Sequence, residues 1–324
     1  MAGPREQITV VVPYYNECDN LPYLLQRLAE QTLAPHEVIL VNSSSTDGSS
    51  YLVDKWISVQ KSPIRFHNLN AATNTPGGSK SAGVKASQSE LLAFMDCGLS
   101  FPKDWLQRQS AALETSSADW VSGVCLTQGA TLVDKAAIAH TYGYLSARPV
   151  IPGSLVRRRV FDRIGLFKDL RAGYDAEWAR ASERAGLQRT INREVVVEYQ
   201  GVNFAPDIRG VFLKSVRYAR PSVGRDDTIT PYVYVLGFAL GASTVALAAA
   251  GLFSFVYVAG GILAYLLGRV MIASWKSSSV TYFLKSPRRV TCLALTGAVM
   301  DLGKTFGFAS GLVLRHVLRR RIVR

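Results

Sequence analysis

The chain has 324 residues, of which 48% are hydrophobic and only 19% are charged, against roughly 25% charged residues in typical soluble domains. This composition excludes a disordered chain, a collagen-like repeat and a small disulfide-rich scaffold, and it favours a globular domain with a membrane-associated part. The four cysteines form no C-x-x-C pair and no zinc spacing with histidine. We therefore expect reduced thiols in a cytosolic compartment.

The positive charge is concentrated at the carboxyl end. The net charge is +13, and the residues after 268 hold eleven Lys or Arg against a single acid, Asp301. Basic residues that flank apolar segments are typical of the cytoplasmic face of a membrane protein. The earlier part of the chain has no basic ribbon interleaved with aromatic residues, so we expect no nucleic-acid partner.

Short apolar runs alternate with amphipathic stretches over the first 126 residues. The run 8–13 is too short for a secretory leader and predicts a buried strand. Further strands are predicted at 37–42, 64–69, 91–96 and 119–126, and helices at 21–31, 50–59 and 103–114. This alternation predicts an α/β fold, with a mainly parallel sheet and helices on both faces.

Polar residues follow three of the predicted strands, in the segments 13–17, 42–45 and 96–98. Ligands of open α/β sheets bind beyond the carboxyl ends of the strands. We therefore expect the binding site at this edge. The following part, 127–227, is less regular and more charged, and a helix is predicted from Asp175 to about Ala185.

A long apolar segment follows, because the 41 residues from Thr228 to Gly268 carry no charge. One membrane span needs about 20 residues, so we predict a hairpin of two transmembrane helices, 231–250 and 253–270. The stretch 290–314 is also apolar but contains Asp301 and Lys304, which can pair inside a third span. A third span would place the arginines 319–321 on the opposite side of the membrane, so we favour an interfacial amphipathic helix within a basic tail, 271–324.

Four segments together resemble the family-two inverting glycosyltransferases of the GT-A fold. They read ITVVVPYYNE, EVILVNSSSTDGSS, LLAFMDCGLSFPKDWL and GSLVRRRVFDRIGLFKDLRAGYDAEW. The resemblance covers about residues 7 to 200. It implies a Rossmann-like GT-A domain over 1–227, with a nucleotide-binding half at 7–126 and an acceptor half at 127–227.

The resemblance implies that Pro13, Tyr15 and Glu17 form a wall for the nucleobase and ribose of a nucleotide-sugar donor. The alternative is an ordinary strand–helix junction in which Asn16 or Asp19 caps the helix.

Further donor contacts are implied at Asn42, Ser43 and Lys80. Asn42 stands where the family has an acid that binds the base, and an amide can donate or accept, so bases other than uracil stay open. Gly77, Gly78 and Lys80 match a glycine-rich stretch whose helix N-terminus and cation suit a diphosphate; a turn with a solvated lysine is the alternative.

Asp96 matches the first Asp of the family's D-x-D motif, which binds ribose and a divalent metal, and Gly98 replaces the second. Mg²⁺ or Mn²⁺ prefers oxygen ligands, so Asp96 is the expected metal ligand and one ligand of the pattern is missing. The chain also has no His after its later strand, at 199–201, where the family often supplies one. Metal dependence is therefore left open.

The resemblance assigns the general base to Asp175, because Tyr174 and Asp175 stand where the family has a Glu-Asp pair. Glu177 is the reserve candidate, and the alternative is that both are first-turn acids of a helix. We expect Trp178 to belong to the core. The arginines 157–159 either meet an anionic lipid phosphate or form a solvated basic face.

We therefore expect a multi-pass inner or plasma membrane protein with a cytoplasmic catalytic domain. It would transfer a sugar to a lipid-linked saccharide, with inversion, in envelope or exopolysaccharide synthesis. One alternative is transfer directly to polyprenyl phosphate. The other is a catalytically degenerate assembly partner, which the departures at Asn42, Gly98 and Tyr174 motivate.

Overall fold

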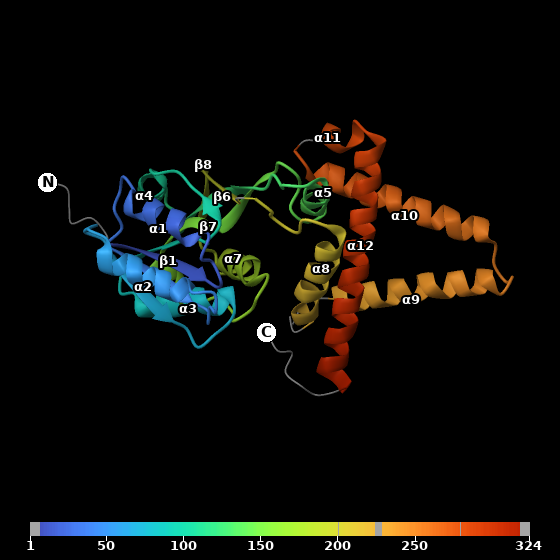
Figure 1. Cartoon of the computed structure of the whole chain (residues 1–324), viewed down its shortest axis with the longest axis horizontal. Coiled ribbons are helices and arrows are strands. Elements are labelled where there is room, and N and C mark those ends of the chain that lie inside the picture. The colour runs from blue at the N-terminus through green and yellow to red at the C-terminus, as the bar shows by residue number, and fades with distance from the viewer. Residues whose placement is uncertain (1–6, 200, 224–228, 279, 318–324) are drawn as a thin grey trace. The chain divides into compact units, whose positions relative to one another are not determined.

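The computed structural model describes residues 7–199, 201–223, 229–278 and 280–317 (Figure 1). The described chain divides into two compact units. The first comprises the residues up to Leu126 together with Ala147–Tyr199, and the second comprises Thr127–Ser146 together with the residues from Gly201 onward. The arginines 319–321, which entered the topology prediction, lie outside the described residues.

The first unit is built on an eight-stranded sheet with the order β3-β2-β1-β4-β7-β6-β8-β5. Its strands are β1 Ile8–Tyr14, β2 Glu37–Asn42, β3 Arg65–Asn70, β4 Leu91–Phe94, β5 Leu99–Ser100, β6 Trp120–Leu126, β7 Ala147–Arg157 and β8 Arg189–Tyr199. The strands β3, β2, β1 and β4 run parallel, as predicted. The other half is mixed, because β7 is antiparallel to both β4 and β6.

Helices cover both faces of this sheet. Val10 and Val12 of β1 pack with α1, α2 and α4, whereas Val11 packs with α3, α6 and α7. The bounds are α1 Leu21–Ala29, α2 Ser49–Val59, α4 Trp105–Thr115, α3 Pro76–Ala86, α6 Arg158–Ile164 and α7 Tyr174–Arg184. Because side chains alternate along a strand, a strand buried on both faces must be apolar throughout. The predicted α/β class with helices on both faces is confirmed.

The second unit is helical and contains 127–146 and 201–223, which were predicted to belong to the domain 1–227; that domain division stays a prediction. Its helices are α5 Leu132–Thr141, α8 Ile208–Ser222, α9 Thr230–Ala249, α10 Phe255–Lys276, α11 Val280–Leu284 and α12 Pro287–Leu312, followed by a π-helical turn, η1 Val313–Val317. The fully buried carboxylate of Asp134 accepts backbone N–H groups of Asn203, Phe204 and Ala205, at 2.9, 2.6 and 3.0 Å. These bonds join 127–146 to the segment after 200, so neither belongs to the first unit.

The two helices α9 and α10 form the predicted apolar hairpin. They turn at Gly251, whose φ of +74° is a left-handed conformation that favours glycine. By length and composition both helices can cross a membrane. Only 6% of the apolar stretch of each helix is buried by the rest of the described chain. Leu240 and Val256, for example, expose 69% and 76% of their surface. Apolar faces of this length match the hydrocarbon core of a bilayer.

The helix α12 packs closely within the second unit. A Cβ on Gly307 would lie 2.6 Å from the carbonyl oxygen of Val216 in α8, so only glycine permits this approach. Asp301 binds Arg269 of α10 at 3.0 Å and lies 3.9 Å from Lys304, its predicted partner. The charges of this segment therefore face neighbouring helices. Its placement at the membrane interface stays a prediction.

Candidate functional site

The carboxyl ends of β1, β2 and β4 meet at one edge of the sheet, because β1 lies between the other two in parallel register. Hydrogen bonds join the loops that follow β1 and β2. The Asn16 amide donates to Ser45 Oγ at 3.0 Å, the Thr46 amide to Asn16 Oδ1 at 2.8 Å, and the Glu17 amide to Ser49 Oγ at 2.8 Å. Asn16 has a φ of +54°, a conformation that Asn tolerates better than most residues. The loop after β1 is thus held in one shape.

This loop presents two of the predicted wall residues. Tyr15 is 47% exposed, and Glu17 and Pro13 are half-buried. Asn20 Nδ2 donates to Glu17 Oε2 at 2.6 Å. Burial raises the pKa of Glu17, and the nearby carboxylate of Asp96 adds to the rise, although the bond from Asn20 opposes it. Tyr15 therefore offers an aromatic surface at this edge, and Glu17 offers a carboxyl group.

The side chains of Asn42 and Ser43, which were predicted to contact the donor, form hydrogen bonds within the protein. Asn42 Nδ2 donates to Asn70 Oδ1 at 2.9 Å, and its Oδ1 accepts from the Ser45 amide at 2.9 Å. Ser43 Oγ lies 2.7 Å from Ser79 Oγ. Both residues are buried. They brace the loop after β2, and their predicted contact with a nucleotide-sugar donor stays a prediction.

The glycine-rich N-terminus of α3, which the resemblance assigns to a diphosphate, is closely approached by the segment before α7. A Cβ on Gly77 would collide with the carbonyl oxygen of Lys168, and one on Gly78 would lie 2.7 Å from Asp169 Oδ1. The hydroxyl of Thr75 caps the helix by accepting the Gly78 amide at 3.1 Å. The glycines therefore allow the segment before α7 to approach the helix closely.

Lys80 is fully buried, which rules out the alternative of a solvated lysine, while its predicted contact with a diphosphate stays a prediction. Its ammonium group donates to Asp96 and to the hydroxyl of Tyr174, the latter at 3.1 Å, and it lies 5.4 Å from the centre of the Tyr174 ring. A buried charge needs such partners. Lys80 thus joins α3, the end of β4 and the start of α7. Through Asp96, whose side chain is 24% exposed, Lys80 is connected to the edge of the sheet where β1, β2 and β4 end.

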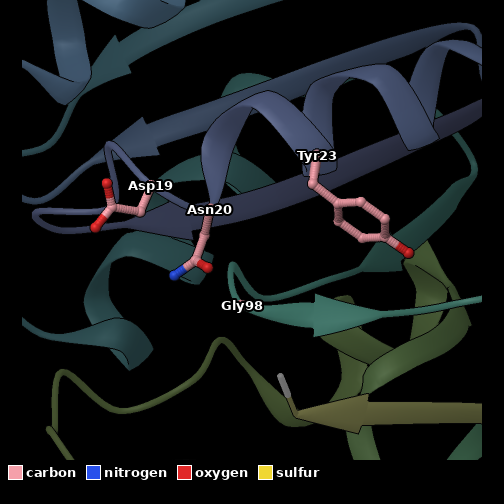
Figure 2. Close-up of a pocket in the computed structure, with 4 residues that line it drawn as sticks. All are labelled: Asp19, Asn20, Tyr23 and Gly98. Carbon is pink, nitrogen blue, oxygen red and sulfur yellow. The ribbon is translucent and has the colours of Figure 1, made fainter. Parts of the chain in front are cut away.

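A hollow of about 420 Å³ adjoins this edge and is lined by Asp19, Asn20, Tyr23 and Gly98. Figure 2 shows Asp19 and Asn20 just before α1 and Tyr23 on it, with Asn20 directed toward the loop at Gly98. A Cβ on Gly98 would lie 3.5 Å from Asn20 Nδ2. Sequence reasoning missed Asn20, the residue immediately before α1, and Tyr23, in its first turn.

The side chains at this edge do not fit a metal held by the protein alone. Among the described residues, no three His, Cys, Asp or Glu side chains come together. The charge of Asp96 is balanced by Lys80. Burial raises the pKa of Cys97 well above its ordinary value, which leaves a neutral thiol that is a poor ligand.

Asp175 lines a second cavity of about 460 Å³, on the face of the sheet that α7 covers. It lies in the first turn of α7, after Gly173 with a φ of +75°. Nothing in the described parts of the chain makes a hydrogen bond or an ion pair with its side chain. Asp175 is therefore a carboxylate with room beside it for a substrate.

The other predicted residues around α7 have structural roles. Glu177 pairs with Lys168 and does not line the cavity, so it is a weaker candidate for the base than Asp175. Trp178 is 4% exposed, and its indole N–H donates to the Gly165 carbonyl at 3.1 Å. The expectation that Trp178 belongs to the core is confirmed.

Two of the three consecutive arginines are bound by the protein itself. Arg158 donates to the carbonyl oxygens of Ser87 and Ser89, at 2.9 and 2.7 Å, and so satisfies the C-terminal end of α3. Arg159 pairs with Asp119 at 2.8 Å. These contacts account for both side chains without a lipid phosphate.

Comparison with known proteins matches residues 9–167 to the family described as Glycosyl transferase family 2. Glycosyltransferase AglE of Haloferax volcanii is 24% identical over 204 residues, 58% of this chain and 65% of the relative. An undecaprenyl-phosphate 4-deoxy-4-formamido-L-arabinose transferase of Pseudomonas fluorescens is 30% identical over 114 residues, 34% of this chain and 33% of the relative. The chain therefore spans less than two thirds of the length of these curated relatives.

Among solved structures, the chain resembles the mannosyltransferase PcManGT of Pyrobaculum calidifontis in complex with GDP-Man and Mn²⁺. The TM-score is 0.54 at 18% identity, over 92% of this chain and 88% of that one. At this identity the likeness establishes the fold alone, and it confirms the predicted GT-A architecture.

Proposed function

Because residues 9–167 belong to glycosyl transferase family 2, we propose that the chain transfers a sugar from a nucleotide donor to an acceptor hydroxyl with inversion. The observation that carries the proposal is the position of Asp175. Asp175 lines a cavity of about 460 Å³ and lies in the first turn of α7. Tyr174, its neighbour, is bonded to Lys80, and Lys80 is bonded to Asp96 at the edge where we place the donor. A donor at the edge and an acceptor in the cavity would meet near one carboxylate.

The reaction is a single in-line displacement. The acceptor oxygen forms a bond to the anomeric carbon while the bond from that carbon to the donor's phosphate oxygen breaks, and the nucleoside diphosphate leaves. The acceptor proton goes to Asp175, which acts as general base. Displacement from the opposite side of the carbon inverts its configuration.

Tyr15 and Glu17 are the residues that we assign to the nucleotide. Tyr15 exposes a ring on which a base can stack, and Glu17 can accept hydrogen bonds from ribose hydroxyls. Asp96 extends this set from the end of β4. Its carboxylate forms an ion pair with the buried ammonium group of Lys80.

We propose that α9 and α10 anchor the protein in a membrane with the glycosyltransferase domain on the cytoplasmic side. Two apolar helices with outward-facing side chains and the basic residues that follow them support this placement. The acceptor that fits an anchored enzyme is a lipid-linked saccharide of envelope or exopolysaccharide synthesis. Direct transfer to polyprenyl phosphate is the second candidate, and the name of the Pseudomonas fluorescens relative favours it.

The test begins with a thermal-shift screen of the detergent-solubilised chain against sugar nucleotides. Transfer from the best ligand is then followed by proton NMR, which reports the configuration of the new anomeric centre. A shift with one nucleotide class, followed by an inverted product, supports the proposal. Binding without transfer to any saccharide or prenyl acceptor would indicate a degenerate assembly partner, and a retained configuration would refute the displacement.

A further inference from the structure

The cavity beside Asp175 runs along one face of α7. The helix residues that line it are Asp175, Ala176, Ala179, Arg180 and Glu183. They share a face because residues three and four positions apart lie above one another on a helix. From the first to the last of them the helix rises about 12 Å, and the two alanines have side chains too small to fill the space. The volume of about 460 Å³ lies within the range of small-molecule sites, about 300 to 1,000 Å³.

The sheet supplies the rest of the wall. Pro149, Val150 and Ile151 of β7 contribute apolar surface, and Ser122 of β6 contributes a hydroxyl group. Sites for small ligands combine an apolar lining with a few polar groups that fix the orientation of the ligand. A sugar ring has C–H groups on its faces and hydroxyl groups around its rim. The wall is therefore chemically complementary to a saccharide.

The hydroxyl of Ser122 is the part of this wall that lacks a partner. Ser122 is 1% exposed and lines the cavity. In the described parts of the chain its hydroxyl makes no hydrogen bond. Burial has removed its hydrogen bonds to bulk water without replacing them, so a group of this kind calls for an explanation. A hydroxyl of a ligand in the cavity supplies the missing partner.

The backbone explains how this hydroxyl comes to face the cavity. The pairing of β6 with both β7 and β8 shifts at Ser122 and Gly123, which marks a β-bulge. Bulges re-aim side chains and are frequent beside active sites. A Cβ on Gly123 would lie 3.0 Å from the Val195 carbonyl oxygen, so the absence of a side chain lets β8 approach β6 closely beside Ser122.

We propose that Ser122 is an acceptor-positioning residue, whose hydroxyl binds one hydroxyl of a saccharide acceptor and so presents a second hydroxyl of that sugar to Asp175. The inference rests on the proposed function, in which Asp175 is the general base. The oxygen of the second hydroxyl bonds to the donor's anomeric carbon, its proton passes to Asp175, and the nucleoside diphosphate leaves with the electrons of the broken bond. The hydroxyl bound to Ser122 keeps its proton. Ser122 therefore selects which hydroxyl reacts.

The pairing of a serine hydroxyl with a carboxylate favours a saccharide acceptor over polyprenyl phosphate. A phosphate monoester is already ionised at neutral pH, so its oxygen attacks without losing a proton and needs no base. A sugar hydroxyl is protonated at neutral pH and does need one. A carboxylate at the reacting position also repels a phosphate, because both are negatively charged.

The experiment measures binding of simple glycosides to the full-length chain by saturation-transfer NMR. The detergent must lack a sugar head group, because a glycoside detergent would compete. The probes are the methyl glycosides of glucose, galactose, mannose and N-acetylglucosamine, followed by the monodeoxy derivatives of the tightest binder. In the wild type, one deoxy derivative should bind about threefold to tenfold more weakly than its parent, the expected loss of a neutral hydrogen bond.

The Ser122→Ala variant completes a double-mutant cycle with these probes. It should bind the parent glycoside as weakly as the wild type binds that deoxy derivative, and it should no longer distinguish the two. The matched control is Ser154→Ala. Ser154 of β7 is also buried with an unpaired hydroxyl among the described residues, but it does not line the cavity. Ser154→Ala should discriminate like the wild type, and both variants should keep the wild-type melting temperature, because neither removes a hydrogen bond of the protein.

Three results would overturn the inference. The first is a wild type that binds none of the four glycosides. The second is a Ser122→Ala variant that still distinguishes the parent from its deoxy derivative. The third is displacement of the glycoside by farnesyl phosphate whose own binding weakens in Ser122→Ala, which would assign the cavity to a prenyl phosphate.

The outcome for Ser122 is separable from the outcome for the proposed function. If a sugar nucleotide shifts the melting temperature and transfer inverts, but Ser122→Ala binds glycosides like the wild type, the inference is wrong and the proposed function stands. If no sugar nucleotide binds while the cycle shows that glycoside binding depends on Ser122, the saccharide site stands and the proposed transfer is wrong.

Discussion

Replacing the proposed base by its amide, Asp175→Asn, is expected to abolish most of the transfer while preserving donor binding. Asn keeps the shape of the side chain but cannot accept the acceptor's proton. Loss of a general base costs about a hundredfold to ten-thousandfold in rate, which corresponds to about 3 to 5 kcal/mol of activation barrier. Asp175 does not contact the donor edge in this structure, so the donor's Kd should change little.

The structural cost of this change is small by comparison. Asp175 is a first-turn acid of α7, and such an acid stabilises a helix by about 0.3 to 1 kcal/mol. For a unit of this size, that loss lowers the melting temperature by at most about 2 to 4 °C. A rate loss of a hundredfold therefore cannot come from unfolding at the assay temperature.

The assay compares initial transfer rates with donor Kd for the wild type, Asp175→Asn and the control Glu177→Gln. Glu177 pairs with Lys168 outside the cavity, and a partly exposed ion pair contributes no more than about 1 kcal/mol. Glu177→Gln should therefore transfer at nearly the normal rate. A near-normal rate for Asp175→Asn, with collapse of Glu177→Gln, would refute the assignment and move the base two residues along.

Three further outcomes are expected. Chelation should slow transfer less than in relatives with both acids of the D-x-D motif, and complete loss of wild-type activity in chelator, restored by Mn²⁺ alone, would contradict this. Gly98→Asp should increase the response of transfer to Mn²⁺. It should lower the free energy of unfolding by about 1 kcal/mol, because residue 98 has a φ of +76°. Because burial raises the pKa of Glu17, the folded state holds this proton more tightly than the unfolded state. The stability contribution of Glu17 should therefore fall as pH rises above the ordinary carboxyl pKa of about 4.3, and Glu17→Gln should reduce this dependence of the melting temperature on pH. An unchanged slope would count against it. Reporter fusions after Gly224 and after Arg324 should both report the cytoplasmic side, whereas an external carboxyl terminus would indicate a third span.

The sequence predicted the elements whose signals are local. Val10, Val11 and Val12 belong to an uninterrupted apolar run, which requires a strand covered on both sides. The uncharged segment 228–268 is twice the length of a span, and this length predicted two helices with a turn near Gly251. In the structure the two helices lie on either side of Gly251, which has a left-handed conformation. The position of Asp175 at the start of a helix followed from the motif around it.

The tertiary structure decided which of the candidate side chains are available to a substrate. Asn42, Ser43 and Lys80 look like donor ligands in the linear chain, but each is enclosed by partners distant in sequence, such as Asn70, Ser79 and Tyr174. A hydrogen bond between residues 94 positions apart leaves no periodic trace in either segment.

The grouping of elements was also a tertiary outcome. The buried carboxylate of Asp134 accepts N–H groups from residues about 70 positions later, and those bonds draw 127–146 out of the domain that the motifs delimit. Sequence patterns record which residues avoid water, whereas only the folded chain determines which polar groups meet.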